Sequence, residues 1–231
     1  MRIARTETKY RLSADKYGLL LDKLTRLLEA DEHNGPFGYT VTSLYFDSVL
    51  NKDYYDKIDG LENRKKIRLR FYNRETDQIK LEMKIKDNTY QAKESMLIYK
   101  GDAILLQEGE YDCLLKYQDP FADKIRHIMT TRSYRPVVKI QYTRRAFIGE
   151  VNATRITFDY DLRVSETSLD LFESEDYLER IPTQFFAILE VKSTGELPHY
   201  IKTQLAPLTE SSRAVSKYRE SRWLFEELNI L

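Results

Sequence analysis

The amino-acid sequence predicts an α+β fold built around a large antiparallel sheet or barrel. Strand-length segments follow one another through short polar links, without the regular strand–helix–strand alternation of a parallel sheet. The chain of 231 residues also contains 17 tyrosines and 10 phenylalanines, and aromatic residues are enriched in strands. No linker or internal repeat interrupts the pattern, so residues 1–231 are expected to form a single domain.

The first half of the chain alternates between strand and helix signals. Ile3 to Leu12 has the period of a strand, and Ser13 suits the cap of a leucine-rich helix that ends near Asp31. A further strand and a short helix precede three strands joined by polar links of hairpin length. These later elements are expected at 39–46 (strand), 47–59 (helix), and 64–73, 78–86 and 90–98 (strands).

The second half begins with a mostly helical stretch, 101–131, that is expected to break near Asp119 and Pro120. Strand patterns then resume at 136–148, 153–159 and 184–192. An acidic segment at 165–178 is expected to be a surface excursion. The last segment, 211–228, is expected to be helical.

The overall charge argues against a general nucleic-acid binder. Lys+Arg and Asp+Glu balance at 37 each, so an anion site must come from local clustering of basic residues. Cys113 is the only cysteine, which rules out an intrachain disulfide. The three histidines are scattered and lack the spacing of metal ligands.

The sequence carries no signal-peptide pattern at its N-terminus. The longest apolar run, Phe185 to Leu189, is far too short to span a bilayer. A cytoplasmic protein is therefore expected. Association with a membrane through a protein partner is left open, and so is the oligomeric state.

Charged side chains alternate with apolar ones along several of the expected strands. Since residues two apart share one face of a strand, each strand presents its ionised groups together. The sets are Glu7 with Lys9; Lys66 with Arg68 and Arg70; Lys80 with Glu82, Lys84 and Lys86; Tyr142 with Arg144; Arg155 with Asp159; and Glu190 with Lys192. The simplest interpretation is a sheet with one solvated face. The other is a closed sheet whose charged faces line an internal tunnel.

Two features favour the tunnel. Glu190 and Lys192 are the charged residues at the end of a strand that is otherwise apolar. Because so apolar a strand is usually buried, these two side chains need a polar site inside the protein. Most basic residues also lack an acidic partner on their own strand, and on one concave face they would repel one another unless an anion neutralised them. The expected ligand is a polyanion such as a nucleoside triphosphate or polyphosphate, together with a carboxylate-bound Mg²⁺ or Mn²⁺.

Seven short pieces of the chain, in order, resemble the triphosphate tunnel metalloenzymes, and among them the VTC-type polyphosphate polymerase domain. The pieces are ETKY at 7–10, SLYFD at 43–47, IRLR at 67–70, LEMK at 81–84, QYTR at 141–144, LEVK at 189–192 and SKY at 216–218. The resemblance covers nearly the whole chain. It implies an eight-stranded antiparallel β-barrel with surrounding helices, enclosing a phosphate-filled tunnel.

The resemblance also implies roles for individual residues. The residues expected to be catalytic in phosphoryl transfer are Arg68, Arg70, Lys84, Arg144, Lys192 and Glu190. Those expected to bind phosphate or nucleotide are Lys9, Lys57, Lys93, Tyr142, Arg155, Ser216 and Lys217. Glu190 matches the family's metal-binding glutamate, and Glu82 or Glu7 is expected to help it hold Mn²⁺ or Mg²⁺.

One departure from the superfamily bears on the reaction. Its hydrolases usually carry Glu-x-Glu-x-Lys on the first strand, whereas this chain has Arg5 in place of the first glutamate. The loss of one metal-coordinating carboxylate favours the VTC branch over the triphosphatases and the class IV adenylyl cyclases.

Three hypotheses about function follow. The first is transfer of the ATP γ-phosphate to a growing polyphosphate chain, with release of ADP. The second is hydrolysis of tripolyphosphate or a nucleoside triphosphate at the same residues. The third is a polyphosphate-binding module without turnover, in which the carboxylates serve as ion-pair partners of the lysines.

Overall fold

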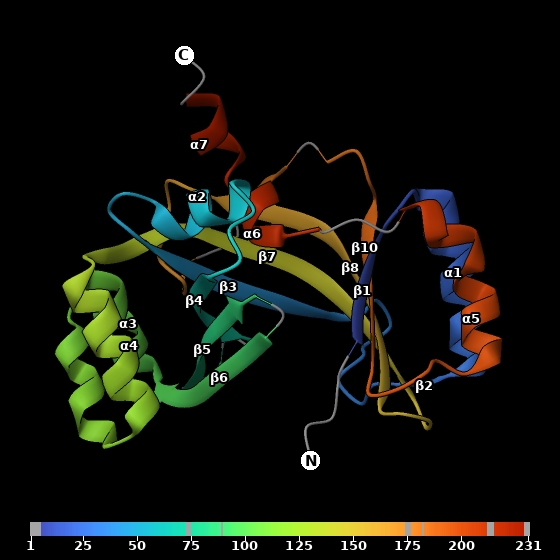
Figure 1. Ribbon diagram of the computed structural model, residues 1–231, viewed down its shortest axis with the longest axis horizontal. Helices are drawn as coiled ribbons and strands as arrows, with labels where there is room; N and C mark the ends of the chain where they lie inside the picture. The colour runs from blue at the N-terminus through green and yellow to red at the C-terminus, as the bar shows by residue number, and fades with distance from the viewer. Residues whose placement is uncertain are drawn as a thin grey trace. The chain divides into compact units, whose positions relative to one another are not determined.

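The computed structural model describes residues 6–72, 75–88, 90–173, 177–181, 183–211 and 215–228, so Arg5 lies outside the described residues. The strands are β1 (Thr6–Leu12), β2 (Glu29–Ala30), β3 (Tyr39–Ser48), β4 (Arg64–Phe71), β5 (Gln78–Asp87), β6 (Tyr90–Tyr99), β7 (Tyr134–Gly149), β8 (Thr154–Ser165), β9 (Glu179–Arg180) and β10 (Ala187–Ser193). The α-helices are α1 (Ala14–Leu27), α2 (Lys52–Ile58), α3 (Lys100–Glu108), α4 (Pro120–Thr131), α5 (His199–Leu205), α6 (Lys217–Glu220) and α7 (Trp223–Leu228), and the 3-10 helices are η1 (Tyr111–Tyr117) and η3 (Ala206–Ser211) (Figure 1).

The predicted α+β class with an antiparallel eight-stranded sheet and surrounding helices is confirmed. Neighbouring strands follow the order β1-β10-β8-β7-β3-β4-β5-β6, with β2 beside β7 and β9 beside β8. Every described register between two strands is antiparallel. Within the described residues, β1 and β6 are the two ends of this path. No helix in the described part of the chain is both long and apolar enough to cross a membrane.

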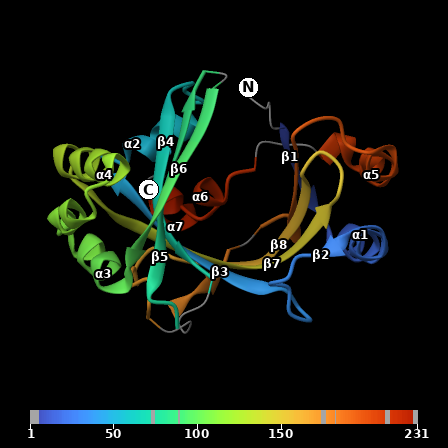
Figure 2. The same ribbon diagram turned by 90° about the horizontal axis from the view of Figure 1, so that it is seen from below.

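The chain divides into two compact units. The first unit comprises residues 1–40, 142–162 and 182–216, and the second comprises 41–141, 163–181 and 217–231. In the first unit, α1 and α5 cover one face of the strands β1, β10 and β8 (Figure 2). Leu24 of α1 and Ile201 of α5 are fully buried there with Leu189 of β10.

The second unit has its own core on one face of β3, β4, β5 and β6. Helices α3, η1 and α4 cover that face, where Leu69, Leu81 and Ile125 have no exposed surface. Burying a large aliphatic side chain contributes about 1.5–3 kcal/mol, so this face fixes the register of the strands. The opposite face of each strand is then left for the charged residues.

The break predicted near Asp119 and Pro120 is confirmed. The Asp119 carboxylate accepts hydrogen bonds from the backbone N–H groups of Phe121 (2.7 Å) and Ala122 (3.3 Å), which caps the start of α4. Pro120 is the first residue of that helix, where its missing N–H costs nothing. The Ser13 cap is also confirmed, because its hydroxyl accepts from the backbone N–H of Lys16.

Four element predictions are wrong in detail. The helix expected at 47–59 begins only at Lys52, because the Asp47 carboxylate accepts from the backbone N–H groups of residues 48, 53 and 54 and β3 continues to Ser48. The strand expected to end at 159 continues to Ser165, where β8 pairs with β9. Of the helix expected at 211–228, residues 212–214 lie outside the described residues, and 217–228 form two short helices with a break at residues 221–222. The segment 165–178 is not wholly at the surface, since Leu171 is buried in the second core.

Candidate functional site

The second unit presents basic residues on the face of its sheet that lies opposite α3, η1 and α4. Arg68 of β4 lies opposite Tyr45 of β3 and Glu82 of β5 in the strand register, and Arg70 lies opposite Ser43. Lys66 lies opposite Lys84, which in turn lies opposite Lys93 of β6. Cross-strand partners share a face, so the predicted alternation of charged and apolar faces is correct for these strands.

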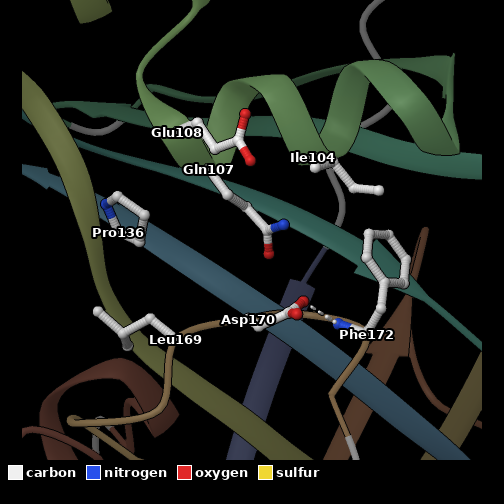
Figure 3. Close-up of a pocket in the computed structure, with 7 residues that line it drawn as sticks. All are labelled: Ile104, Gln107, Glu108, Pro136, Leu169, Asp170 and Phe172. Atoms are coloured by element: carbon white, nitrogen blue, oxygen red, sulfur yellow. Dashed lines mark hydrogen bonds between the residues drawn. The ribbon is translucent and has the colours of Figure 1, made fainter.

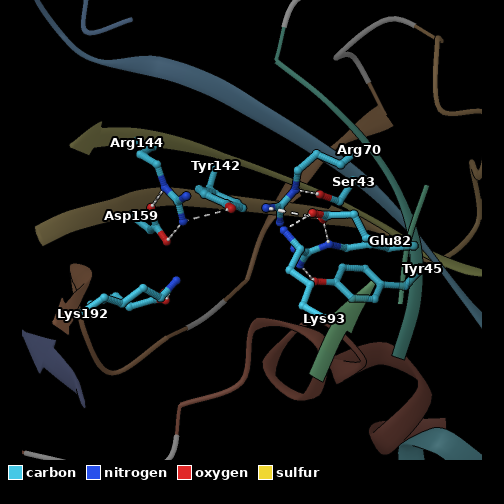
Figure 4. Close-up of polar contacts among 11 residues, drawn as sticks. Ser43, Tyr45, Arg70, Glu82, Lys93, Tyr142, Arg144, Asp159 and Lys192 are labelled. Atoms are coloured by element: carbon cyan, nitrogen blue, oxygen red, sulfur yellow. Dashed lines mark hydrogen bonds and ion pairs between the residues drawn. The ribbon is translucent and has the colours of Figure 1, made fainter. Parts of the chain in front are cut away.

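Glu82 is the centre of this face and is only 2% exposed. Arg68 Nε lies 2.7 Å from Glu82 Oε2, Arg70 Nη1 lies 4.0 Å from the same oxygen, and Lys93 pairs with Oε1. We call Ser43, Tyr45, Arg68, Arg70, Glu82 and Lys93 the Glu82 cluster. All of them except Arg68 are labelled in Figure 4. One carboxylate with three cations leaves an excess of positive charge, which suits an anionic ligand.

Two residues of the Glu82 cluster orient its arginines. Arg70 Nε donates to Ser43 Oγ at 3.0 Å, and Arg68 Nη1 donates to Tyr45 Oη at 2.8 Å. Burial alone would raise the pKa of Tyr45, but Arg68, followed by Arg70, outweighs burial and lowers that pKa below its usual value. The lowered pKa reflects the positive potential at this face.

The Glu82 ion pairs predict how stability depends on pH. Burial alone would raise the pKa of Glu82, but the Arg68 charge, then the Arg70 charge, then Lys93 lower it from 4.5 to about 2. Because the pKa is lower in the folded state, the stabilisation is complete above pH 4.5 and is lost as the pH falls through about 2. We expect the difference in free energy of unfolding between wild type and Glu82→Gln to shrink by about 3 kcal/mol between pH 7 and pH 2. Urea denaturation across this range measures it, and a difference that does not change with pH contradicts the assignment.

The first unit carries a second set of charges on β1 and β10. Lys9 lies opposite Glu190 in the register and Glu7 lies opposite Lys192. Lys9 Nζ is 3.0 Å from Glu7 Oε1 and 3.9 Å from Glu190 Oε2, and Lys192 pairs with the other oxygen of Glu190. Burial alone would lower the pKa of Lys9, but Glu190, then Glu7, raise it above its usual value. We call these four residues the Glu190 cluster.

Arg144 of β7 is held by a buried carboxylate in the first unit. Its Nε and Nη2 atoms donate to Asp159 at 2.7 and 2.8 Å, and Nη2 also lies 3.3 Å from Tyr142 Oη (Figure 4). A bidentate pair of this kind fixes the plane of a guanidinium. Gly38 approaches the same strand, and a Cβ at this position would collide with the Arg144 carbonyl. The loop before β3 therefore requires glycine at 38, which also has a φ of +90°.

Arg155 of β8 is held in a similar way. Its Nη1 atom lies 2.7 Å from Asp31 Oδ2, and Asp31 is buried. In the strand register Arg155 lies opposite Lys192, so it shares a face with the Glu190 cluster. The first unit thus brings together seven of the predicted site residues, which are Glu7, Lys9, Tyr142, Arg144, Arg155, Glu190 and Lys192.

Other predicted site residues have less defined surroundings. Lys84 is exposed on β5, Lys57 is half-buried in the last turn of α2, and Ser216 is buried just before α6. Lys217 is the first residue of α6, a helix of four residues rather than the long helix that was expected. The roles of these four residues, like those of the other predicted site residues, stay predictions.

Glu7 and Glu190 are the predicted carboxylates that best fit a divalent metal ion. Across the described ranges, no three or more His, Cys, Asp or Glu side chains gather as a metal site would need. Glu7 and Glu190 nevertheless both contact Lys9, and Mg²⁺ commonly takes only one or two protein carboxylates and leaves its other positions to water and phosphate. These two residues fit that donor set. Glu82 fits it less well, since its oxygens already face Arg68, Arg70 and Lys93.

Several residues that orient the arginines described above are not among the predicted site residues. They are Ser43, Tyr45, Asp31 and Asp159. The alternation of Ser43 and Tyr45 along a strand would have placed them on the same face as the arginines opposite them. Asp31 gives no comparable signal, because it lies in the loop after β2 and is distant from Arg155 in the sequence.

A hollow of about 330 Å³ in the second unit is a poor candidate for a phosphate site. Its lining residues are Ile104, Gln107, Glu108, Pro136, Leu169, Asp170 and Phe172 (Figure 3). The only charged side chains among these seven are the two carboxylates, which would repel an anion. The charged faces of the strands are therefore the better candidates.

Comparisons with known proteins identify the family and the fold of this chain. A family model described as the VTC domain matches residues 4–225. An adenylyl cyclase candidate from Hippeastrum, described as having a dominant triphosphatase activity, is 14% identical, with 95% of this chain and 96% of that chain covered and a TM-score of 0.57. An adenylate cyclase candidate from Bacillus halodurans is 12% identical, with 91% and 92% covered and a TM-score of 0.51. Such low identities show a shared fold alone. No curated protein sequence matches the chain significantly.

Proposed function

This chain belongs to the VTC domain family, and from that premise we propose that it transfers the γ-phosphate of ATP to a growing polyphosphate chain and releases ADP. Family membership and fold support the coarser statement, an activity on polyphosphate or triphosphate. The observation that carries the proposal is the convergence of Arg68, Arg70 and Lys93 on the single carboxylate of Glu82. Such a surplus of oriented donors suits a chain of phosphates and few other metabolites.

The proposed mechanism needs little covalent chemistry from the protein. Phosphoryl transfer depends mainly on positioning and on neutralising charge in the transition state. The residues proposed to do this are Arg68, Arg70, Lys84, Arg144 and Lys192. Phosphate or nucleotide is proposed to bind Lys9, Lys57, Lys93, Tyr142, Arg155, Ser216 and Lys217. The acceptor phosphate is already ionised, so no histidine or cysteine base is required.

A divalent cation, Mn²⁺ or Mg²⁺, is proposed to be held by Glu190 with help from Glu7. When bound, it would neutralise charge on the phosphate oxygens. Glu190 also pairs with Lys192 and lies 3.9 Å from Lys9 Nζ, so it orients both lysines. Its proposed role is thus to hold both the metal and the two lysines.

Hydrolysis of tripolyphosphate or a nucleoside triphosphate is the second candidate. The triphosphatase activity described for the Hippeastrum protein of the same fold favours it. The arginine at position 5, in place of a metal-binding glutamate, favours the polymerase. A binding module without turnover is the third candidate, in which Glu190 is only a counter-ion.

Product stoichiometry separates these candidates. With ATP and Mn²⁺, the polymerase proposal predicts that ADP accumulates with little free phosphate, and that adding short polyphosphate shortens any lag. Coupled assays for ADP and for phosphate on the same samples measure both quantities. Equal amounts of ADP and free phosphate from the start would support hydrolysis instead. A protein that binds tripolyphosphate and yields neither product would be a binding module.

A further inference from the structure

The C-terminal segment, defined as residues 217–228 in α6 and α7, is too short to be stable by itself. Its helices contain four and six residues, and isolated helices below about 12 residues are marginal in water. The segment therefore owes its position to contacts with the rest of the second unit, where α6 lies beside α2 (Figure 1). Two buried polar residues make those contacts.

The first of these residues is Tyr218, which is 2% exposed. Its hydroxyl donates to Asp47 Oδ2 at 2.6 Å. Asp47 is fully buried, and the same carboxylate accepts from backbone N–H groups at the start of α2. Burial, and then the Asp47 charge, raise the pKa of Tyr218 well above its usual value, so the hydroxyl remains a donor. A charge-assisted bond in such surroundings is costly to break.

The second of these residues is Arg222. Its Nε donates to Glu166 Oε2 at 3.0 Å, and both of its Nη atoms lie 3.2 Å from Asn51 Oδ1. Glu166 Oε1 also accepts from the backbone N–H of Leu224 at 2.8 Å, which caps α7. A buried ion pair with its hydrogen bonds satisfied specifies one arrangement of the chain more than it stabilises the fold.

These contacts place Tyr218 on the charged face of the second unit. Its ring stacks on Tyr45 with centroids 5.1 Å apart, and Lys66 Nζ lies 5.2 Å from the centroid of the same ring. Tyr45 is the residue whose hydroxyl accepts from Arg68. Lys217 is adjacent to Tyr218 in the chain, and its charge is among those that lower the pKa of Tyr45. The Tyr218–Asp47 bond thus fixes the backbone that carries Lys217 next to the ring that stacks on Tyr45.

We propose that Tyr218 is a positioning residue that, through its bond to Asp47, holds Lys217 where it binds phosphate together with Arg68 and Arg70. The proposal rests on the phosphate-binding part of the proposed function and does not require that the reaction is polymerisation. It differs from a merely structural role, in which loss of the Tyr218 hydroxyl would lower stability and leave affinity unchanged.

The test is a double-mutant cycle on tripolyphosphate binding. Isothermal titration calorimetry measures the affinity of each variant directly, so the readout is binding and not the rate of a reaction. Tyr218→Phe keeps the stacked ring and removes the donor, and we expect it to weaken binding about tenfold. Lys217→Ala should weaken binding by a similar factor. In the Lys217→Ala background, Tyr218→Phe should then change affinity less than about twofold, because there is no longer a lysine to position.

Tyr117→Phe is the matched control. Tyr117 also donates its hydroxyl to an aspartate that is 3% exposed, Asp102, in the same unit but on the side of the helices. This variant should lose stability and keep wild-type affinity. Thermal unfolding of each variant shows that the titrated protein is folded.

The possible outcomes bear on different proposals. A Tyr218→Phe protein that binds like wild type, or a loss that adds in full to that of Lys217→Ala, overturns the positioning role. Binding of tripolyphosphate without conversion of ATP overturns the proposed reaction and leaves the positioning role intact. If wild-type protein does not bind tripolyphosphate, both proposals fall.

Discussion

Glu190→Gln is expected to lower the turnover number for ATP by at least about 1,000-fold. The substitution is nearly isosteric, and it removes the negative charge that pairs with Lys192 and lies 3.9 Å from Lys9 Nζ. It also removes the carboxylate proposed to hold the divalent cation. Lost stabilisation of transition-state charge by several kcal/mol corresponds to a factor of this size, since each tenfold in rate is about 1.4 kcal/mol. Initial rates of ADP formation measure the effect.

The control is Glu196→Gln, in the same unit. The Glu196 side chain is exposed and pairs only loosely, at 3.5 Å, with Lys202. It should leave the rate unchanged. If Glu190 is only a counter-ion for the two lysines, Glu190→Gln will lower stability while activity per folded molecule persists, and the metal role proposed for Glu190 is then wrong.

Arg68→Gln is expected to weaken tripolyphosphate binding by roughly 100-fold, the effect of losing one or two hydrogen bonds to a charged group. Arg68 lies between Glu82 and Tyr45, at 2.7 and 2.8 Å, so its guanidinium is already oriented before a ligand arrives. Removing it also leaves Glu82 with fewer partners. The double variant Arg68→Gln/Glu82→Gln restores the charge balance and should bind as weakly as the single variant.

Arg126→Gln is the matched control for Arg68→Gln. Arg126 pairs with Asp112 at 3.1 Å on α4, which covers the opposite, apolar face of the second unit. The two variants lose the same net charge, so a general electrostatic effect would weaken binding equally in both. Calorimetric titration that finds equal affinities for wild type and Arg68→Gln contradicts the assignment of this face to phosphate.

The faces of the strands could be predicted from sequence because a strand has a period of two. That rule placed Arg68 with Arg70 on one strand, Glu82 with Lys84 on the next, and Glu190 with Lys192 on a third, without knowledge of the fold. The resemblance to the VTC-type domain then supplied the strand number. The same rule applied to 39–48 would have added Ser43 and Tyr45 to the candidate site.

The partners that come from distant parts of the chain could not be predicted in this way. Asp47 and Tyr218 are 171 positions apart, and only the fold brings them to 2.6 Å. The last helix was predicted to be continuous because local propensity does not reveal that Glu166 caps a new helix at Leu224. The prediction that a helix begins at residue 47 is wrong for a related reason. The Asp47 carboxylate accepts hydrogen bonds from backbone N–H groups in the first turn of α2, so the helix begins after it.

The most direct test of the central claim is the fate of the γ-phosphate. Purified protein is incubated with γ-labelled ATP and Mn²⁺, and the products are resolved on a polyacrylamide gel beside the Glu190→Gln variant. The proposed function predicts a ladder of labelled polyphosphate with one ADP formed for each phosphate incorporated, and no ladder from the variant. Label that appears only as free phosphate would contradict polymerisation and identify the protein as a triphosphatase.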